Sequence, residues 1–113
     1  MILSTIIAMM TVGEAAAWKL TIYNQENYQG NHLQYHSNTG DRGCYSWGTY
    51  PNMNDKVKSF KWEGDSLTCL KFYADAECRG DRLGSFVADT DRPSVTQNGQ
   101  RMSSAFVDGR FGC

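Results

Sequence analysis

Four cysteines offer the clearest chemistry in this sequence of 113 residues: Cys44, Cys69, Cys78 and Cys113. An even number of cysteines in a short chain is typical of two disulfides when the protein is exported to an oxidising compartment. A zinc site is disfavoured, because no C-x2-C or H-x3-5-H pair stands beside a second pair at finger spacing. The cysteines allow three disulfide pairings, and the residues alone do not choose between them.

The other side chains with catalytic potential form no recognisable constellation. His32 and His36 stand four residues apart, but on a strand they would be too far apart to share one metal ion. Asp89 and Asp91 lie in a polar stretch where solvation is the expected role. The sequence contains no G-x-S-x-G, no H-E-x-x-H and no glycine-rich phosphate loop. A catalytic thiol is disfavoured in the same way, since no Cys–His pattern is visible. We therefore predict a protein that is not an enzyme.

The amino-terminal segment, residues 1–17, is typical of a secretory signal peptide. Residues 2–12 form an apolar run too short to span a bilayer, and Ala15-Ala16-Ala17 is a small-residue cleavage site. No Lys or Arg precedes the run, so a buried amino-terminal strand or helix is the alternative. Cleavage after Ala17 predicts a secreted, extracellular domain of residues 18–113.

The charge of the predicted mature chain is balanced, with 11 basic residues and, once Glu14 is removed, 11 acidic ones. Nucleic acids and anionic membranes both favour a concentrated positive field on their protein partners. We therefore expect no nucleic-acid partner and no membrane insertion of the mature chain.

A repeat at an offset of fifty residues organises the elements that must position these side chains. Residues 20–30 and 70–80 share an apolar residue, a second apolar residue, a tyrosine and a closing glycine. Leu20, Ile22, Tyr23 and Gly30 of the first copy correspond to Leu70, Phe72, Tyr73 and Gly80 of the second. Such a repeat indicates two copies of one supersecondary unit.

Alternation of apolar and polar residues predicts short strands throughout the mature chain. No stretch has convincing helical periodicity, and residues 63–66 form a turn between the two halves. Strands at roughly ten-residue spacing are typical of an antiparallel β-sandwich. The predicted strands are residues 18–23, 31–35, 44–47, 57–62, 67–73, 81–87, 94–96 and 102–108.

Two motifs, Tyr23-x4-Tyr28-x-Gly30 and Asn54-Asp55-Lys56-Val57-Lys58-Ser59, resemble the signatures of the βγ-crystallin family, in its single-domain, secreted microbial type. Tyr23-x4-Tyr28-x-Gly30 resembles the aromatic-x4-aromatic-x-glycine signature of its Greek key. Asn54-Asp55-Lys56-Val57-Lys58-Ser59 resembles its calcium stretch. In the second half Cys78 replaces the second aromatic residue, and residues 99–104 keep two serines without the Asn/Asp pair.

The resemblance implies an all-β fold, an antiparallel β-sandwich of two Greek key motifs at about residues 18–64 and 65–113. In each motif a hairpin folds back over its sheet, and Gly30 or Gly80 supplies a backbone conformation that other residues adopt only with strain. Ser59 and Ser104 are expected to hydrogen-bond to the backbone of the folded hairpin. Tyr28 is expected to cover the edge of the sandwich.

The resemblance also implies two adjoining calcium sites, each built from Asn/Asp and main-chain oxygens of one stretch and a hydroxyl of the other. Asn54 and Asp55 would meet the Ser103 hydroxyl in one site. The other site would combine Gln100 with Lys58, whose ammonium group repels a dication. We therefore expect at most one weak calcium site.

Further oxygens for this site are expected from the backbone of residues 23–30 or 73–80. We place Glu26 and Glu77 at equivalent loop positions, where each could donate a backbone oxygen. The rival interpretation is that both sites are inactive and that Lys58 replaces calcium by a salt bridge to Asp55.

The repeat suggests a preference among the disulfide pairings. Cys78 takes the place of Tyr28, and Cys69 begins the strand that leads into the second hairpin. We therefore favour Cys69–Cys78 together with Cys44–Cys113.

The function predicted from these observations is that of a secreted, disulfide-stabilised, non-enzymatic module that binds at most one calcium ion weakly. The alternative is a secreted antimicrobial or killer-toxin-like protein, an effector or a protease inhibitor on the same fold, directed at a protein or cell-surface target. An inhibitor would need an exposed rigid loop, for which residues 37–43 and 89–99 are the candidates.

Overall fold

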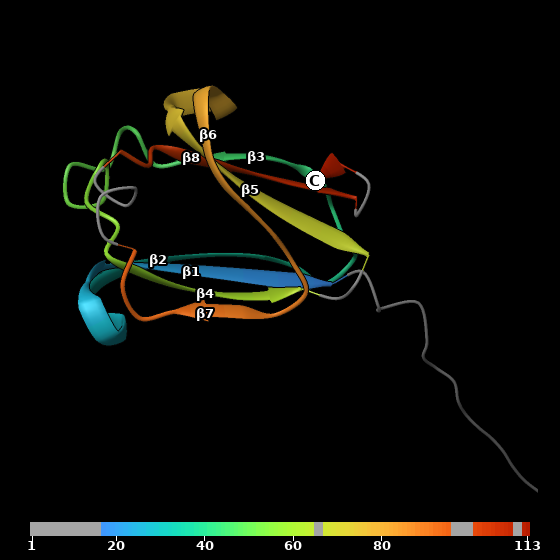
Figure 1. The fold of residues 1–113 in the computed structure, drawn as a ribbon, viewed down its shortest axis with the longest axis horizontal. Coiled ribbons are helices and arrows are strands. Elements are labelled where there is room, and N and C mark those ends of the chain that lie inside the picture. The colour runs from blue at the N-terminus through green and yellow to red at the C-terminus, as the bar shows by residue number, and fades with distance from the viewer. Residues whose placement is uncertain (1–16, 65–66, 96–100, 110–111) are drawn as a thin grey trace, which may run out of the picture.

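The computed structural model of the chain describes residues 17–64, 67–95, 101–109 and 112–113. Two four-stranded antiparallel sheets pack face to face (Figure 1). Sheet A has the order β2-β1-β4-β7 and sheet B the order β3-β8-β5-β6. The strands are β1 (Trp18–Gln25), β2 (Gln29–Ser37), β3 (Gly43–Ser46), β4 (Ser59–Gly64), β5 (Thr68–Asp75), β6 (Arg79–Val87), β7 (Thr90–Arg92) and β8 (Ser104–Gly109).

The third strand of each half is exchanged between the sheets. Strand β3 of the first half pairs with β8 of the second, and β7 of the second half pairs with β4 of the first. The two halves therefore interlock, and the predicted sandwich of two Greek key motifs is confirmed. The signal peptide predicted at residues 1–17 lies outside the described residues except for Ala17.

Seven of the predicted strands are present within a few residues, but the one predicted at residues 94–96 is wrong. The strand is β7, whose Arg92 pairs with Phe60 of β4. Pro93 follows it directly and has no N–H to continue the ladder. Two short 3-10 turns, η3 (Glu26–Tyr28) and η4 (Ala76–Cys78), were not predicted either.

The core lies between the inner faces of the two sheets. Alternate residues of β1 and β4 point inward from sheet A, and alternate residues of β5 and β8 point inward from sheet B. The rings of Phe60 and Phe72 meet across the interface with centroids 5.0 Å apart. Each fully buried side chain of this size stabilises the fold by about 1.5–3 kcal/mol. The fully buried set includes Leu20, Ile22, Trp47, Val57, Phe60, Trp62, Leu70, Phe72, Ala105 and Val107.

The disulfides are Cys44–Cys78 and Cys69–Cys113, with Cα atoms 6.0 and 5.8 Å apart. The pairing that the sequence favoured, Cys69–Cys78 with Cys44–Cys113, is therefore wrong. Cys69 lies near the start of β5, and Cys78 lies in η4 beyond its end. Because a strand rises about 3.3 Å per residue, β5 separates the two cysteines by roughly 20 Å. The exchange of β3 into sheet B instead brings Cys44 beside η4.

No helix in the described ranges is long and apolar enough to cross a membrane.

Candidate cation site

The two hairpin tips have the same backbone conformation. Asn27 and Tyr28 in η3 have φ angles of 58° and 61°, and Glu77 and Cys78 in η4 have φ angles of 62° and 57°. Two consecutive residues in this left-handed region are uncommon outside glycine. The match at both tips confirms that Cys78 occupies the place of Tyr28.

The first tip is fastened by Ser59, which is fully buried. Its hydroxyl donates to the carbonyl of Gln25 at 2.6 Å and accepts from the backbone N–H of Tyr28 at 3.0 Å. These two groups have no backbone hydrogen-bond partner on a neighbouring strand, because the hairpin tip lies outside the β-ladder. Ser59 therefore satisfies two backbone groups that would otherwise be unpaired.

Ser104 fastens the second tip in the same way and is also fully buried. Its hydroxyl donates to the carbonyl of Asp75 at 2.6 Å and accepts from the backbone N–H of Cys78 at 2.8 Å. The predicted role of both serines is confirmed.

The glycines after the tips have positive φ angles, 81° at Gly30 and 79° at Gly80. A Cβ atom at Gly30 would collide with Oδ1 of Asn24, and one at Gly80 would lie 2.6 Å from Oδ2 of Asp75. Both positions therefore require glycine for conformation and for space.

Asn54, Asp55 and Ser103 meet where the closing stretches of the two halves adjoin. The Ser103 hydroxyl lies 2.6 Å from Oδ1 of Asn54 and 3.1 Å from Oδ1 of Asp55, as hydrogen-bond donor to both. Ser103 is only 6% exposed, whereas Asp55 is exposed. We call these three residues the Ser103 corner.

Backbone hydrogen bonds hold the Ser103 corner in place. The N–H of Asp55 donates to the carbonyl of Met102 at 3.0 Å, and the N–H of Ser103 donates to the carbonyl of Tyr73 at 3.0 Å. The N–H of Trp47 donates to the carbonyl of Ser103 at 2.9 Å. The oxygens of the corner are thus positioned by the fold and not by flexible side chains alone.

Lys58 takes the place of Ser103 in the first half. Its N–H donates to the carbonyl of Tyr23 at 2.9 Å, and its carbonyl accepts from the N–H of Val95 at 3.0 Å. An open pocket here is lined by Asn24, Asp55, Lys56 and Lys58, and we call these four residues the Lys58 corner, which shares Asp55 with the Ser103 corner. Two lysines and one aspartate therefore line this pocket.

The salt bridge of the rival interpretation is not formed. In the part of the chain that the structure describes, the ion pairs are Lys19–Glu63, Lys71–Asp108 and Arg101–Asp81. Asp55 and Lys58 therefore line the same pocket without an ion pair between the ammonium and carboxylate groups. Gln100, the expected partner of Lys58 in the second calcium site, lies outside the described residues.

The two glutamates of the hairpin tips are not at equivalent positions, contrary to the sequence-based expectation. The offset of fifty residues aligns Glu26 with Ala76, and Glu77 with Asn27, which shares its left-handed backbone. Glu26 lies in the first hairpin and accepts a hydrogen bond from the Ser94 hydroxyl at 2.7 Å. Glu77 belongs to the second hairpin, which Ser103 and Ser104 fasten.

The donor set of the Ser103 corner fits calcium only in a weak, water-rich site. Calcium prefers six to eight oxygen ligands, and the corner offers one carboxylate, one amide oxygen and one hydroxyl. The described residues include no group of three or more His, Cys, Asp or Glu that could hold a metal ion. Lys56, which the sequence did not single out for this site, directly follows Asp55 and adds a second positively charged residue to the lining of the neighbouring pocket.

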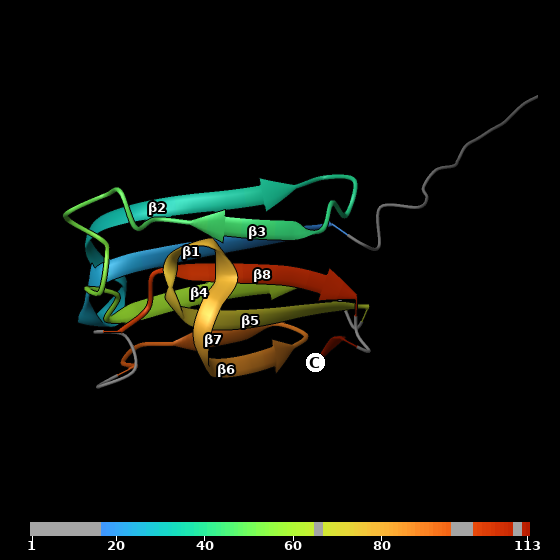
Figure 2. The same ribbon diagram turned by 90° about the horizontal axis from the view of Figure 1, so that it is seen from above.

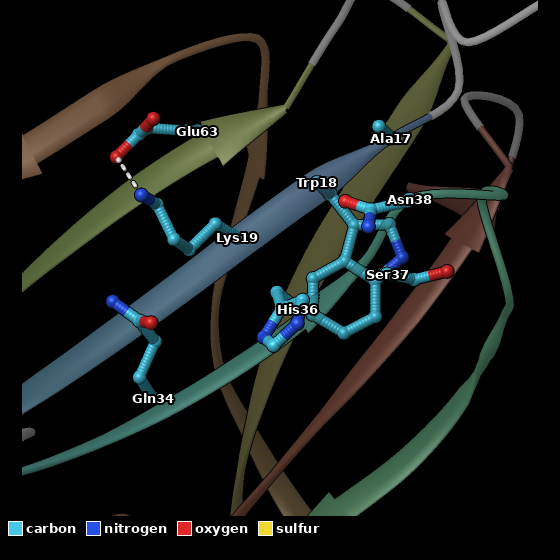
Figure 3. Close-up of a pocket in the computed structure, with 8 residues that line it drawn as sticks. All are labelled: Ala17, Trp18, Lys19, Gln34, His36, Ser37, Asn38 and Glu63. Carbon is cyan, nitrogen blue, oxygen red and sulfur yellow. Dashed lines mark ion pairs between the residues drawn. The ribbon is translucent and has the colours of Figure 1, made fainter.

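A second concave region lies on the outer face of sheet A, where Lys19 separates His36 from Glu63 (Figure 3). Lys19 pairs across the sheet with His36 on one side and with Glu63 on the other, and its ammonium group lies 3.7 Å from the Glu63 carboxylate. His36 and Glu63 are therefore two strands apart, about 9–10 Å, too far to share a proton or a metal ion directly. This groove offers no catalytic pair.

No protein-family model matches the chain, and no curated protein matches it. Several solved structures do match the chain. A protein from a study of the evolution of the eye-lens βγ-crystallin domain fold is 18% identical, with a TM-score of 0.62, over 91% of this chain and 93% of that one. A βγ-crystallin domain from Clostridium beijerinckii is 21% identical, with a TM-score of 0.57, over 78% of this chain and 94% of its own.

A double mutant of clostrillin in complex with nickel is also similar, at 22% identity and a TM-score of 0.57, over 79% of this chain and 95% of that one. These identities are low, so the likeness shows the fold.

Proposed function

We propose that this chain, which has the βγ-crystallin fold and two disulfides, is an extracellular, non-enzymatic module that binds one calcium ion weakly at the Ser103 corner. The observation that carries the proposal is the meeting of three oxygens from both halves: Oδ1 of Asn54, Oδ1 of Asp55 and Oγ of Ser103. The fold brings them together although 48 residues separate Asp55 from Ser103.

Asp55 would supply the charged ligand, and Asn54 and Ser103 the neutral ones. The Ser103 proton, which now points at the two Oδ1 atoms, would rotate away so that its lone pairs face the ion. The carbonyl of Tyr73 accepts one hydrogen bond from Ser103 and keeps a second lone pair. A bound cation supplies positive charge that ties the closing stretch of the first half to that of the second.

The affinity is expected to be low. A single carboxylate contributes to the site, and Lys56 and Lys58 lie beside that carboxylate. We expect a dissociation constant of about 10⁻⁴ to 10⁻³ M, the range of weak extracellular calcium modules.

Calorimetric titration of calcium into the metal-free protein tests the proposal. We expect heat with a stoichiometry of one, loss of that heat in Asp55→Ala, and weakening in Ser103→Ala. Asp91→Ala, which removes an exposed carboxylate from β7, is the matched control and should leave the heat unchanged. Absence of heat up to about 10 mM calcium, well above the expected range, would rule the site out.

Export is supported by the two disulfides, since such bonds persist in oxidising compartments, and by the apolar leader with its small-residue cleavage site. Amino-terminal sequencing of protein collected outside the cell should begin at Trp18. Retention of Met1 on the exported protein would contradict cleavage.

A second candidate function, inhibition of a protease by an inserted loop, is favoured by the order of residues 37–43. The Ser37 hydroxyl accepts from the N–H of Thr39 at 3.2 Å and of Asp41 at 3.0 Å. The indole N–H of Trp18 donates to the carbonyl of Asp41 at 2.7 Å. In the other candidate, residues 89–99, β7 takes up Thr90–Arg92, and residues 96–99 lie outside the described residues.

A protease-inhibition panel with the wild type and with Ser37→Ala tests this second function. We expect Ser37→Ala to weaken inhibition by loosening the loop. Equal inhibition by both proteins, or none by either, would exclude an inhibitor that depends on this loop.

A further inference from the structure

The two open sides of the sandwich are closed differently. Strands β2 and β3 run along one side, and β6 and β7 along the other (Figure 2). On the β2–β3 side Tyr35 and Tyr45 pack against each other as tilted rings, with centroids 5.5 Å apart. Trp18 lies against Tyr45 at 5.1 Å, so this side is sealed by packed rings.

On the β6–β7 side an arginine stands where the first side has a tyrosine. Phe86 pairs with Leu70 as Tyr35 pairs with Leu20, and these leucines are equivalent in the repeat. Arg92 pairs with Phe60, and Tyr45 pairs with Ala105. Phe60 and Ala105 are equivalent, because each directly follows the serine that fastens a hairpin tip, Ser59 or Ser104. The Arg92 guanidinium lies 5.4 Å from the centroid of the Phe86 ring.

Beside this pair is an open slot, lined mainly by apolar side chains, whose floor reaches the core. Its volume is about 180 Å³, close to that of a cavity known to hold a benzene ring, about 150 Å³. Phe60 is fully buried and Met102 is 3% exposed, so the floor of the slot belongs to the core. The slot is lined by Phe60, Leu83, Phe86, Val95 and Met102, with Arg92 and Ser94 at its rim.

The rim of the slot carries a cation that is open to solvent. Arg92 is exposed and, within the described residues, belongs to none of the ion pairs. Ser94 already donates its hydroxyl proton to Glu26 at 2.7 Å. Asp91, the nearest acid along β7, faces the opposite side of the strand from Arg92. The guanidinium is thus the donor left for an incoming anion.

We propose that this slot is a binding site for a small aromatic carboxylic acid. The ring enters the slot against Phe60 and Phe86, where the volume is sufficient for it. The carboxylate remains at the rim, where the planar guanidinium of Arg92 binds it in a bidentate pair. The side chain of Arg92 is long enough to turn from the Phe86 ring to the ligand, which the tyrosine at the equivalent position on the other side cannot do.

Amide chemical shifts recorded during a titration with phenylacetate test the proposal in the oxidised protein. A ligand of this size is expected to bind at about millimolar strength, so the titration extends to about 20 mM. We expect shifts at Leu83, Phe86, Arg92 and Val95. Benzyl alcohol should shift the same amides at higher concentration, and acetate should shift none of them.

The charge at the rim is tested with Arg92→Gln. We expect this variant to bind phenylacetate about tenfold more weakly and benzyl alcohol unchanged, because only the carboxylate uses the guanidinium. Arg82→Gln, which removes an exposed arginine from β6 outside the slot, is the matched control and should bind as the wild type does.

Three outcomes would overturn the proposal. They are the absence of shifts at these amides, shifts confined to another surface, and equal binding of phenylacetate by the wild type and Arg92→Gln. Binding of benzyl alcohol that exceeds that of phenylacetate would also contradict it, since the slot would then be apolar without recognition of the acid.

Discussion

The two halves of the molecule have nearly the same backbone at their hairpin tips and different side chains on it. In the first half Tyr28 packs edge-on against Tyr23, with ring centroids 5.8 Å apart, and the Lys61 ammonium lies 4.6 Å from its ring centroid. In the second half Cys78 stands at the same place and is bonded to Cys44 of β3. The side chain of Tyr28 packs within its own half, whereas Cys78 is bonded covalently to the opposite half.

This difference separates what builds the tip from what covers it. The serine hydroxyl and the positive-φ glycine are present in both halves and satisfy the same backbone requirements. The residue on top can then be an aromatic ring or a sulfur atom. The closing stretches differ in a similar way, because Ser103 supplies an oxygen where Lys58 supplies a positive charge.

Removal of the Cys44–Cys78 disulfide should destabilise the fold more than any other substitution considered for the tips. The double substitution Cys44→Ser/Cys78→Ser should lower the free energy of unfolding by about 4 kcal/mol, because it frees a loop of 34 residues in the unfolded chain. Tyr28→Ala should cost about 1–2 kcal/mol, since its ring is only half buried. Urea denaturation of both variants measures the difference, and equal losses would contradict it.

The shared part of the tips should respond equally in the two halves. Ser59→Ala and Ser104→Ala should each lower the free energy of unfolding by about 2 kcal/mol, because each leaves a buried carbonyl and a buried N–H without their partner. Ser85→Ala, on the exposed face of β6, is the control and should change stability by less than about 0.5 kcal/mol. A large inequality between Ser59→Ala and Ser104→Ala would break the equivalence of the tips.

The sequence predicted the parts of the molecule that local pattern and the repeat determine. Alternation gave the strands, and the aligned tyrosines, glycines and serines placed both hairpin tips correctly. Asp55 and Ser103, 48 residues apart, were expected to meet, and they do.

The wrong predictions come from the exchange of strands between halves and from features that residue type alone does not show. Cys44 and Cys78 became neighbours because β3 joins the second sheet, which no spacing along the chain reveals. The three-residue strand β7 is defined by its pairing with β4 and has too few residues to show alternation. Glu26 and Glu77 were matched by residue type, whereas the backbone aligns Glu77 with Asn27.

The two sides of the sandwich should differ in their response to alkali. Burial raises the pKa of Tyr35 above its ordinary value of 10.0, with a smaller contribution from Tyr50, and burial and then Asp41 raise the pKa of Tyr45. The folded state therefore keeps these protons when the unfolded state loses them. The contribution of these two tyrosines to the free energy of unfolding is present below pH 10.0 and is lost as the pH rises above that value.

Urea denaturation at a series of pH values measures this loss. The stability of the wild type should fall above pH 10.0, and Tyr35→Phe/Tyr45→Phe should show a smaller fall. Tyr73→Phe, which leaves the β2–β3 side intact, is the control and should behave as the wild type does. An identical alkaline fall in the double variant would contradict the role of this pair.

A substitution at Lys58 should change the calcium affinity only slightly, and it tests the difference between the two corners. Lys58→Ser removes one of the two ammonium groups that line the pocket beside Asp55. The calcium affinity should rise about two- to threefold, as expected for removing a solvent-screened repulsion. Calorimetry measures the change, and a weaker affinity in Lys58→Ser would contradict the assignment of Lys58 as an opponent of the ion.

The two corners differ in charge, and we expect only the Ser103 corner to bind a cation. Amide chemical shifts during a calcium titration test it most directly, because they report both corners in one experiment. We expect shifts at Asn54, Asp55 and Ser103 and along residues 73–78, with little change at Lys58 and along residues 23–28. Equal shifts at both corners, shifts centred on Lys58, or no shift at either corner would contradict it.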